Sequence, residues 1–220
     1  PGSRFCGTCG MPLGVPTEER RVVSVLFADL VGFTGLSERL DPEQVKHLVD
    51  GAFERLVQDV VSFGGRVDKI VGDAIVALFG APLAHEDDAE RAVRAALRMQ
   101  ESLADFAAET GVEVRMRVGV NTGEVLVGAL RAGGDYTAMG DVVNLASRLQ
   151  TSADPGSVLV GEPTRLVTED TIAYESRGRL VVRGRDQPVE AHRALEPIAR
   201  PGERPWSPRV PLVGRHSEIS

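Results

Sequence analysis

Two aspartates stand where a carboxylate could bind a metal ion. Asp29 follows the apolar run Val22–Phe27, whose β-branched and aromatic residues are typical of a strand buried on both faces. Asp73 follows Gly72 between two extended runs within Arg66–Phe79, a pattern that predicts a two-residue hairpin turn. Taken alone, each aspartate is more often a turn residue than a ligand. Together, carboxylates from two strand ends can share divalent cations, because magnesium prefers oxygen ligands and leaves room for substrate phosphates.

The residues after Asp29 could bind a phosphate. Gly32, Phe33 and Thr34 form a predicted tight turn, and its backbone N–H groups could face phosphate oxygens. A cation bound by Asp29 would then lie beside that phosphate.

Three further polar side chains have ordinary interpretations when taken alone. Arg117 lies in the strand predicted for Val112–Thr122, where a lone arginine usually points to solvent. Asn144 and Arg148 lie one turn apart in the helix predicted for Asp141–Gln150, and this spacing alone favours a solvated helix face. A guanidinium group nevertheless carries a fixed charge and a fork of donors that suit phosphate oxygens.

Four segments occur in the order FADLVGFT, KIVGD, MRVGVNTG and TAMGDVVNLASR. Together they resemble the catalytic domain of class III adenylate and guanylate cyclases, in particular the bacterial, mycobacterial type of adenylate cyclase. The resemblance covers about Arg21 to Leu195, and four motifs in one order leave little room for coincidence. It implies an α/β (α+β) fold, namely a ferredoxin-like βαββαβ sandwich with helices on one face of the sheet.

The resemblance implies a metal centre and a catalytic pair. Asp29 and Asp73 would hold two ions, Mg²⁺ or Mn²⁺, in each active site, with the Leu30 carbonyl as an extra ligand. Asn144 would orient the ribose of the substrate, and Arg148 would stabilise charge on the α-phosphoryl group.

By the same resemblance, Arg117 and Arg183 bind the triphosphate, which Gly32, Phe33 and Thr34 also contact. Arg183 replaces the lysine of the family's V-K-G motif. Positive charge is retained at this position, while reach and geometry differ.

Two positions are matched to the nucleotide base. Lys69 can donate to N1 of adenine, which is an acceptor, whereas N1 of guanine carries a hydrogen. Thr137 stands where many family members have aspartate, and its hydroxyl can accept from the adenine amino group. The resemblance therefore predicts ATP as the substrate, and the neutral Thr137 allows minor use of GTP.

The implied reaction is attack of the ribose 3′-hydroxyl of ATP on the α-phosphorus, which gives 3′,5′-cyclic AMP and pyrophosphate. In the family, each site is built by two subunits. One subunit supplies the positions of Asp29, Asp73 and Arg117, and the other those of Lys69, Thr137, Asn144, Arg148 and Arg183. Because this chain has all of them, the resemblance predicts a head-to-tail homodimer with two equivalent shared sites.

Two other functions remain open on the sequence. A non-catalytic nucleotide-sensing or dimerisation module would have the same fold, but such modules lose metal or transition-state residues that this chain retains. A diguanylate cyclase is favoured only by the segment Gly133–Tyr136, which lacks that family's glutamate and stands beside the cyclase motifs.

Composition favours one sizeable domain. The chain has 220 residues, of which 42% are hydrophobic and 26% charged, and its formal net charge is -7. This acidic balance argues against a general nucleic-acid surface. No apolar run approaches a membrane span and no basic-then-apolar leader precedes the domain, so we expect a cytoplasmic protein without a membrane partner.

We expect the catalytic domain to span 17–196, between two short segments. Residues 1–16 contain Cys6 and Cys9 and resemble the second half of a small zinc ribbon, while a flexible tail with a redox-active pair ranks lower. Residues 197–220 read as a proline-rich linker. Their last ten residues resemble the start of an AAA-type regulatory ATPase domain, and a disordered tail fits equally well.

The remaining elements must position these side chains. We predict a long helix from Asp41 to about Phe63, begun by a capping box with Gln44, and a second from about Glu86 to Glu109. A short helix is expected at 163–167. Further strands are expected at 125–127, 157–160, 172–175, 180–183 and 189–194.

Overall fold

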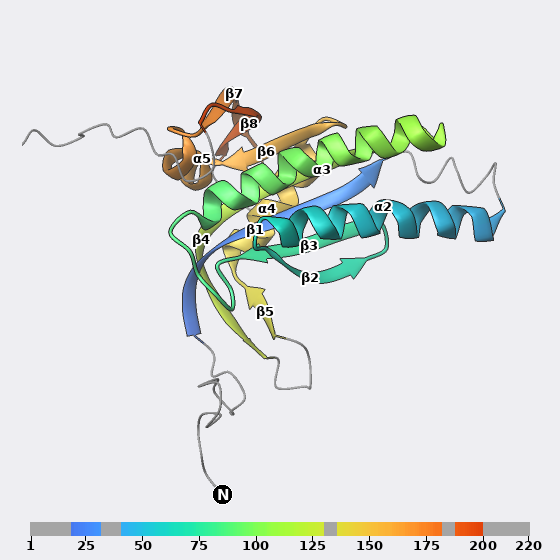
Figure 1. The fold of residues 1–220 in the computed structure, drawn as a ribbon. Helices are drawn as coiled ribbons and strands as arrows, with labels where there is room; N and C mark the ends of the chain where they lie inside the picture. Colours follow the sequence, from blue (N-terminus) through green and yellow to red (C-terminus); the bar gives the residue numbers. More distant parts are fainter. Residues whose placement is uncertain (1–18, 32–40, 130–135, 182–187, 200–220) are drawn as a thin grey trace, which may run out of the picture.

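The structure, a computed structural model, describes residues 19–31, 41–129, 136–181 and 188–199. The elements are β1 (Glu19–Val31), α2 (Pro42–Ser62), β2 (Arg66–Val71), β3 (Ala74–Phe79), α3 (Asp88–Thr110), β4 (Arg115–Ala129), β5 (Tyr136–Met139), α4 (Asp141–Ser152), β6 (Ser157–Gly161), α5 (Glu162–Thr168), β7 (Ile172–Leu180) and β8 (Val189–Pro197). The predicted α+β fold is confirmed (Figure 1). Cys6 and Cys9 lie outside the described residues.

All strands belong to one sheet. Its order is β2-β3-β1-β4-β6-β8-β7, and β5 pairs with β4 outside this path. The central pair is β1 and β4, which are antiparallel from Glu19 opposite Val127 to Val31 opposite Arg115. Only β4 and β6 run parallel among these pairs. The strand that carries Asp29 therefore lies inside the sheet.

The helices cover both faces of the sheet. Leu26 and Ala28 of β1 pack in one core with α2 and α3, which lie side by side across this face (Figure 1). Val25 and Phe27 point the other way, into a core with α4. The expectation that helices share one face is therefore wrong for α4. A strand buried on both faces needs a cover on each side, and α4 supplies the second one.

Two glycines of β4 let α4 approach the sheet closely. A Cβ at Gly119 would overlap the backbone of Ala146 and Gln150, and a Cβ at Gly123 would lie 2.8 Å from Val142 Cγ2. The helix thus rests directly on the strand backbone, which fixes its height over the sheet.

Most predicted elements are confirmed within a few residues. The first long helix begins as expected, because the Asp41 N–H donates to Gln44 Oε1 at 3.3 Å. It is capped by Phe63, and Gly64 follows with φ +80°. The second long helix and the short one are α3 and α5.

Some strands differ in extent from the prediction. The segments predicted at 112–122 and 125–127 belong to one strand, β4, in which Gly123 stays paired with Val23. The strand predicted at 172–175 is β7, which is longer and reaches Leu180, and residues 182–183 of the strand predicted at 180–183 lie outside the described residues. β5 was not predicted, since four residues give too short a pattern.

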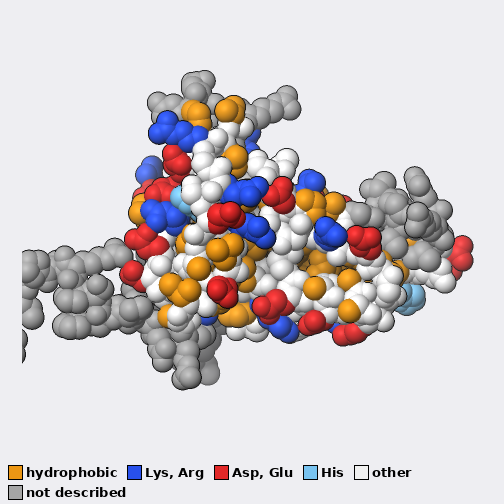
Figure 2. All heavy atoms as spheres, turned by 90° about the horizontal axis from the view of Figure 1, so that it is seen from above, with side chains coloured by type: hydrophobic (Ala, Val, Ile, Leu, Met, Phe, Trp, Pro, Cys, Tyr) orange, Lys and Arg blue, Asp and Glu red, His pale blue; other side chains and the backbone are white. Residues whose placement is uncertain are grey.

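The outer surface mixes charges of both signs. The view in Figure 2 shows acidic and basic side chains interspersed over the described face, with hydrophobic atoms between them. Among the described residues, no helix combines the length and the apolar character needed to cross a bilayer.

We predict that Gly119→Ala destabilises the protein. The methyl group would collide with the backbone of α4, so the free energy of unfolding should fall by about 1–3 kcal/mol or more in chemical denaturation. Gly51→Ala is the matched control. Gly51 lies inside α2, and a Cβ there would lie 3.4 Å from Phe106 Cε2. Alanine at this position should be neutral or stabilise the protein by roughly 0.5–1 kcal/mol. Equal stability of the two variants would contradict the close packing of α4.

Candidate active site

Backbone pairing brings the two predicted metal ligands together. In β1, Asp29 stands opposite Ala74 of β3 and Arg117 of β4. The N–H of Leu30 donates to the carbonyl oxygen of Asp73 at 3.1 Å, which holds the β2–β3 turn against β1. The hairpin predicted from Gly72 and Asp73 is confirmed, since β2 and β3 flank these two residues. The carboxyl groups therefore meet although they are far apart in the sequence.

The environment of Asp29 disfavours its charge. Burial raises the pKa of Asp29 above its ordinary value of 3.8, and Asp73 raises it further by repulsion and by a hydrogen bond between the carboxyl groups. Arg117 and Gln150 lower this pKa, but the net direction is upward. The fold thus holds Asp29 where burial and a second carboxyl group disfavour its charge, and a bound cation would relieve this.

Arg117 provides a cation beside this pair. Its side chain lies on the same face of β4 as Gly119, and the register places it directly across from Asp29. Its Nε is buried and has no hydrogen-bond partner among the described residues. A buried donor without a partner is unfavourable, and an anionic oxygen would satisfy it.

Helix α4 turns its polar residues in different directions. Gln150 is buried, and its Nε2 donates to Asp29 Oδ2 at 3.3 Å. Asn144 is exposed and Arg148 is partly exposed. At about 100° per residue, Arg148 points roughly 200° around the helix from Gln150 and about 40° from Asn144. The predicted catalytic pair is therefore kept together, but it faces away from the Asp29 of its own chain.

Lys69 lies on the same face of the sheet as Asp29. It pairs with Val76, whose side chain belongs to the core under α4. Its Nζ lies 3.4 Å from Asp68 Oδ2, and half of the Lys69 side chain is exposed. The backbone of Thr137 is in β5, opposite Gly128, and nothing is described of its side chain.

The remaining predicted residues lie outside the described part of the chain. These are Gly32, Phe33, Thr34 and Arg183. Their proposed contacts with the triphosphate stay predictions.

Gln150 is the residue that sequence reasoning missed. A glutamine at the end of an amphipathic helix is an ordinary residue, and its partner Asp29 is 121 residues away along the chain. The one available signal was its position next to Leu149 on the buried side of the helix.

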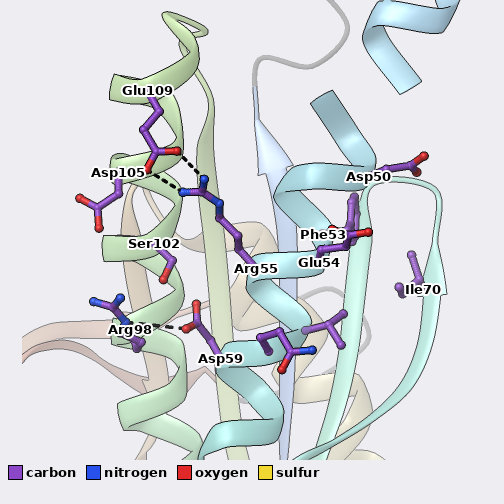
Figure 3. Close-up of a pocket in the computed structure, with 12 residues that line it drawn as sticks. Asp50, Phe53, Glu54, Arg55, Asp59, Ile70, Arg98, Ser102, Asp105 and Glu109 are labelled. Carbon is purple, nitrogen blue, oxygen red and sulfur yellow. Dashed lines mark hydrogen bonds and ion pairs between the residues drawn. The ribbon is translucent and has the colours of Figure 1, made fainter. Parts of the chain in front are cut away.

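A separate groove lies on the opposite face of the sheet, between α2 and α3. It has a volume of about 920 Å³ and contains Arg55, Asp59 and Arg98 (Figure 3). Arg55 is paired with Glu109, and Arg98 Nε lies 3.7 Å from Asp59 Oδ1. Ile70, next to Lys69 in β2, also lines the groove. Neither predicted metal ligand contributes to it.

The residues at the end of β1 fit a hard divalent cation. Asp29, Asp73 and the Leu30 carbonyl offer only oxygen atoms, and a hydrogen bond joins the two carboxyl groups. Magnesium commonly takes one or two carboxylates and completes its shell with water and substrate phosphates. The donor set and the neighbouring Arg117 match that pattern.

The chain is similar to nucleotide cyclases over most of its length. Residues 15–193 match the family described as "Adenylate and Guanylate cyclase catalytic domain". "Adenylate cyclase 1" of Rhizobium meliloti (strain 1021) is 33% identical over 184 residues, which cover 80% of this chain and 28% of that protein. The chain therefore spans less than a third of that relative.

Two solved structures share the fold. The adenylyl cyclase CyaB from P. aeruginosa superposes with a TM-score of 0.79 at 29% identity, covering 82% of this chain and 97% of the other. The guanylyl cyclase Cya2 superposes with a TM-score of 0.78 at 30% identity, covering 85% and 98%. The chain belongs to the class III adenylate and guanylate cyclase catalytic domains. Because one neighbour is an adenylyl and the other a guanylyl cyclase, the fold alone does not fix the base.

We predict that Asp29→Asn stabilises the metal-free protein at neutral pH. The folded state raises the pKa of Asp29, so it binds this proton more tightly than the unfolded state does. Ionised Asp29 therefore lowers stability above its folded pKa, and this penalty vanishes below the ordinary value of 3.8. The melting temperature of Asp29→Asn minus that of wild type, measured in a chelator, should be positive at pH 7 and shrink as the pH falls.

Asp105→Asn is the control for this measurement, because it removes the same charge from an exposed position on α3. An Asp29→Asn variant that melts below wild type at pH 7, or a difference that grows on acidification, would contradict the conclusion that the folded state disfavours the charge of Asp29.

Proposed function

We propose that this domain converts ATP to 3′,5′-cyclic AMP and pyrophosphate at two sites shared by a homodimer. The observation that carries the proposal is the division of the site residues within one chain. Asp29, Asp73 and Arg117 meet at the end of β1, whereas Asn144 and Arg148 point away from them. A second copy is needed to bring the two groups to one nucleotide.

Asp29, Asp73 and the Leu30 carbonyl would hold two Mg²⁺ or Mn²⁺ ions. When bound, these ions supply positive charge that neutralises the triphosphate and lowers the pKa of the attacking 3′-hydroxyl. Arg117 would bind triphosphate oxygens through its buried Nε–H, which has no other partner among the described residues. Gly32, Phe33, Thr34 and Arg183 extend this contact by resemblance.

The catalytic pair would come from the other subunit. Asn144 holds the ribose so that its 3′-oxygen faces the α-phosphorus, and Arg148 donates to the α-phosphoryl oxygens as negative charge builds on them. The 3′-hydroxyl gives its proton to solvent, and the new bond joins the 3′-oxygen to phosphorus. The bond from the α-phosphorus to the oxygen bridging to the β-phosphate breaks, and its electron pair leaves with pyrophosphate.

Lys69 supports ATP as the substrate. Its side chain is half exposed, and its ammonium can donate to adenine N1. By resemblance, it would reach the base from the subunit that supplies Asn144 and Arg148. The Thr137 hydroxyl would accept from the adenine amino group. A neutral acceptor discriminates against guanine less strongly than a carboxylate would, so we expect weak activity with GTP.

Incubation of the purified domain with ATP or GTP and either metal, followed by mass identification of the product, tests the function. We expect cyclic AMP as the main product and no turnover by Asp29→Ala or Asp73→Ala, because each change removes a metal ligand without opening the core.

Lys69→Glu should lower the ATP to GTP activity ratio, because a carboxylate accepts from guanine N1. Cyclic GTP as the main wild-type product would refute the base assignment. A folded domain without any cyclic product would support a nucleotide-sensing module instead.

A further inference from the structure

Gln150 joins the helix that carries the catalytic pair to a predicted metal ligand. Only 8% of Gln150 is exposed, and its Nε2 donates to Asp29 Oδ2 at 3.3 Å. A buried amide in a helix is stabilised by such a partner, and a carboxylate that accepts a fixed hydrogen bond has its oxygens oriented.

The packing of α4 against β4 holds Gln150 in position relative to Asp29. The backbone nitrogen of Gln150 and the carbonyl of Ala146 lie so close to Gly119 that the helix touches the strand backbone. Gly119 is two residues from Arg117, which stands opposite Asp29. A shift of α4 along the sheet would therefore move the donor relative to the carboxylate.

Different sides of α4 thus carry Gln150 and the predicted catalytic pair. Asn144 and Arg148 face away from the Asp29 of their own chain, whereas Gln150 contacts it. We propose that Gln150 is a positioning residue for Asp29 in its own subunit, while Asn144 and Arg148 of the same helix serve the partner's site. Each α4 then belongs to both sites of the dimer. This inference rests on the shared sites of the proposed function.

A mixed dimer with one working site separates the two roles of α4. Arg148→Ala and Asp73→Ala subunits, each inactive alone, are combined. The Arg148→Ala subunit supplies Asp29 and Asp73 to the working site and is called the carboxylate subunit. The Asp73→Ala subunit supplies Asn144 and Arg148 and is called the helix subunit. Random mixing should restore roughly a quarter of wild-type activity, since half of the dimers are mixed and each has one intact site.

Gln150→Leu is then placed in one subunit at a time. In the carboxylate subunit it should lower kcat/KM by about 10-fold, the usual loss when a residue that orients a metal ligand is removed. In the helix subunit it should leave the activity near that of the parent pair, because that Gln150 contacts the Asp29 of the inactive site. Gln100→Leu is the matched control. Gln100 Nε2 donates to the Met116 and Ser157 carbonyls, at 3.0 and 3.2 Å, and does not contact Asp29.

The outcomes distinguish the two proposals. A parent pair that stays inactive after verified subunit exchange would refute the shared site, and the Gln150 proposal with it. If the parent pair is active, three results overturn the Gln150 proposal alone: a loss only in the helix subunit, an equal loss in both, or no loss in either.

Metal binding gives a readout that does not depend on turnover. The Gln150→Leu homodimer, held with an ATP analogue that cannot cyclise, is titrated with Mn²⁺ while free Mn²⁺ is followed by electron paramagnetic resonance. We expect binding about 10-fold weaker than in wild type, and unchanged binding in Gln100→Leu. Equal Mn²⁺ affinity in wild type and Gln150→Leu would contradict the positioning role.

Discussion

The candidate site depends on the partly buried position in which the sheet brings the carboxyl groups of Asp29 and Asp73 together. Asp29 lies near the end of the central strand β1, beside the β2–β3 turn. The hydrogen bond from the Leu30 N–H to the Asp73 carbonyl holds this turn against β1. Backbone pairing along β1 is extensive, so it can sustain an unfavourable contact at one end. Burial raises the pKa of Asp29, and the neighbouring Asp73 carboxyl raises it further. In the proposed function, a divalent cation would offset this unfavourable environment.

The position of α4 is the reason for which the proposed function requires a second subunit. The backbone of α4 contacts the backbone of β4 at Gly119, so this contact fixes the orientation of α4. Gln150 points toward Asp29, and the helical period therefore places Arg148 on the side of α4 that faces away from Asp29. In the proposed dimer, each subunit would carry one half of each of two sites, and the two-fold axis would supply the missing halves.

Local patterns in the sequence were enough to predict the strand and the turn that carry Asp29 and Asp73. A buried strand and a two-residue turn have short-range signals, whereas the metal-binding role of the two aspartates is implied by the motifs and stays a prediction. The side of the sheet on which α4 packs was predicted wrongly. Its buried residues show that it packs on something, but they do not say which face of the sheet receives it. The small residues Gly119 and Gly123 mark that face only once the strand register is known.

The contact between Gln150 and Asp29 was beyond sequence reasoning for a different reason. It joins a strand near the start of the chain to a helix much later, and a single sequence carries no information on such pairs. β5 escaped because a strand of four residues shows no clear period. The predicted roles of Lys69, Thr137 and the residues outside the described ranges rest on the family resemblance.

The dependence of activity on dimerisation tests the central claim most directly. Activity per chain is measured over a dilution series at saturating ATP and metal, and sedimentation gives the dimer fraction under the same conditions. If each site needs Asp29 and Asp73 from one copy and Arg148 from the other, activity per chain should fall in proportion to the dimer fraction. Activity per chain that stays constant once monomers predominate would contradict the account.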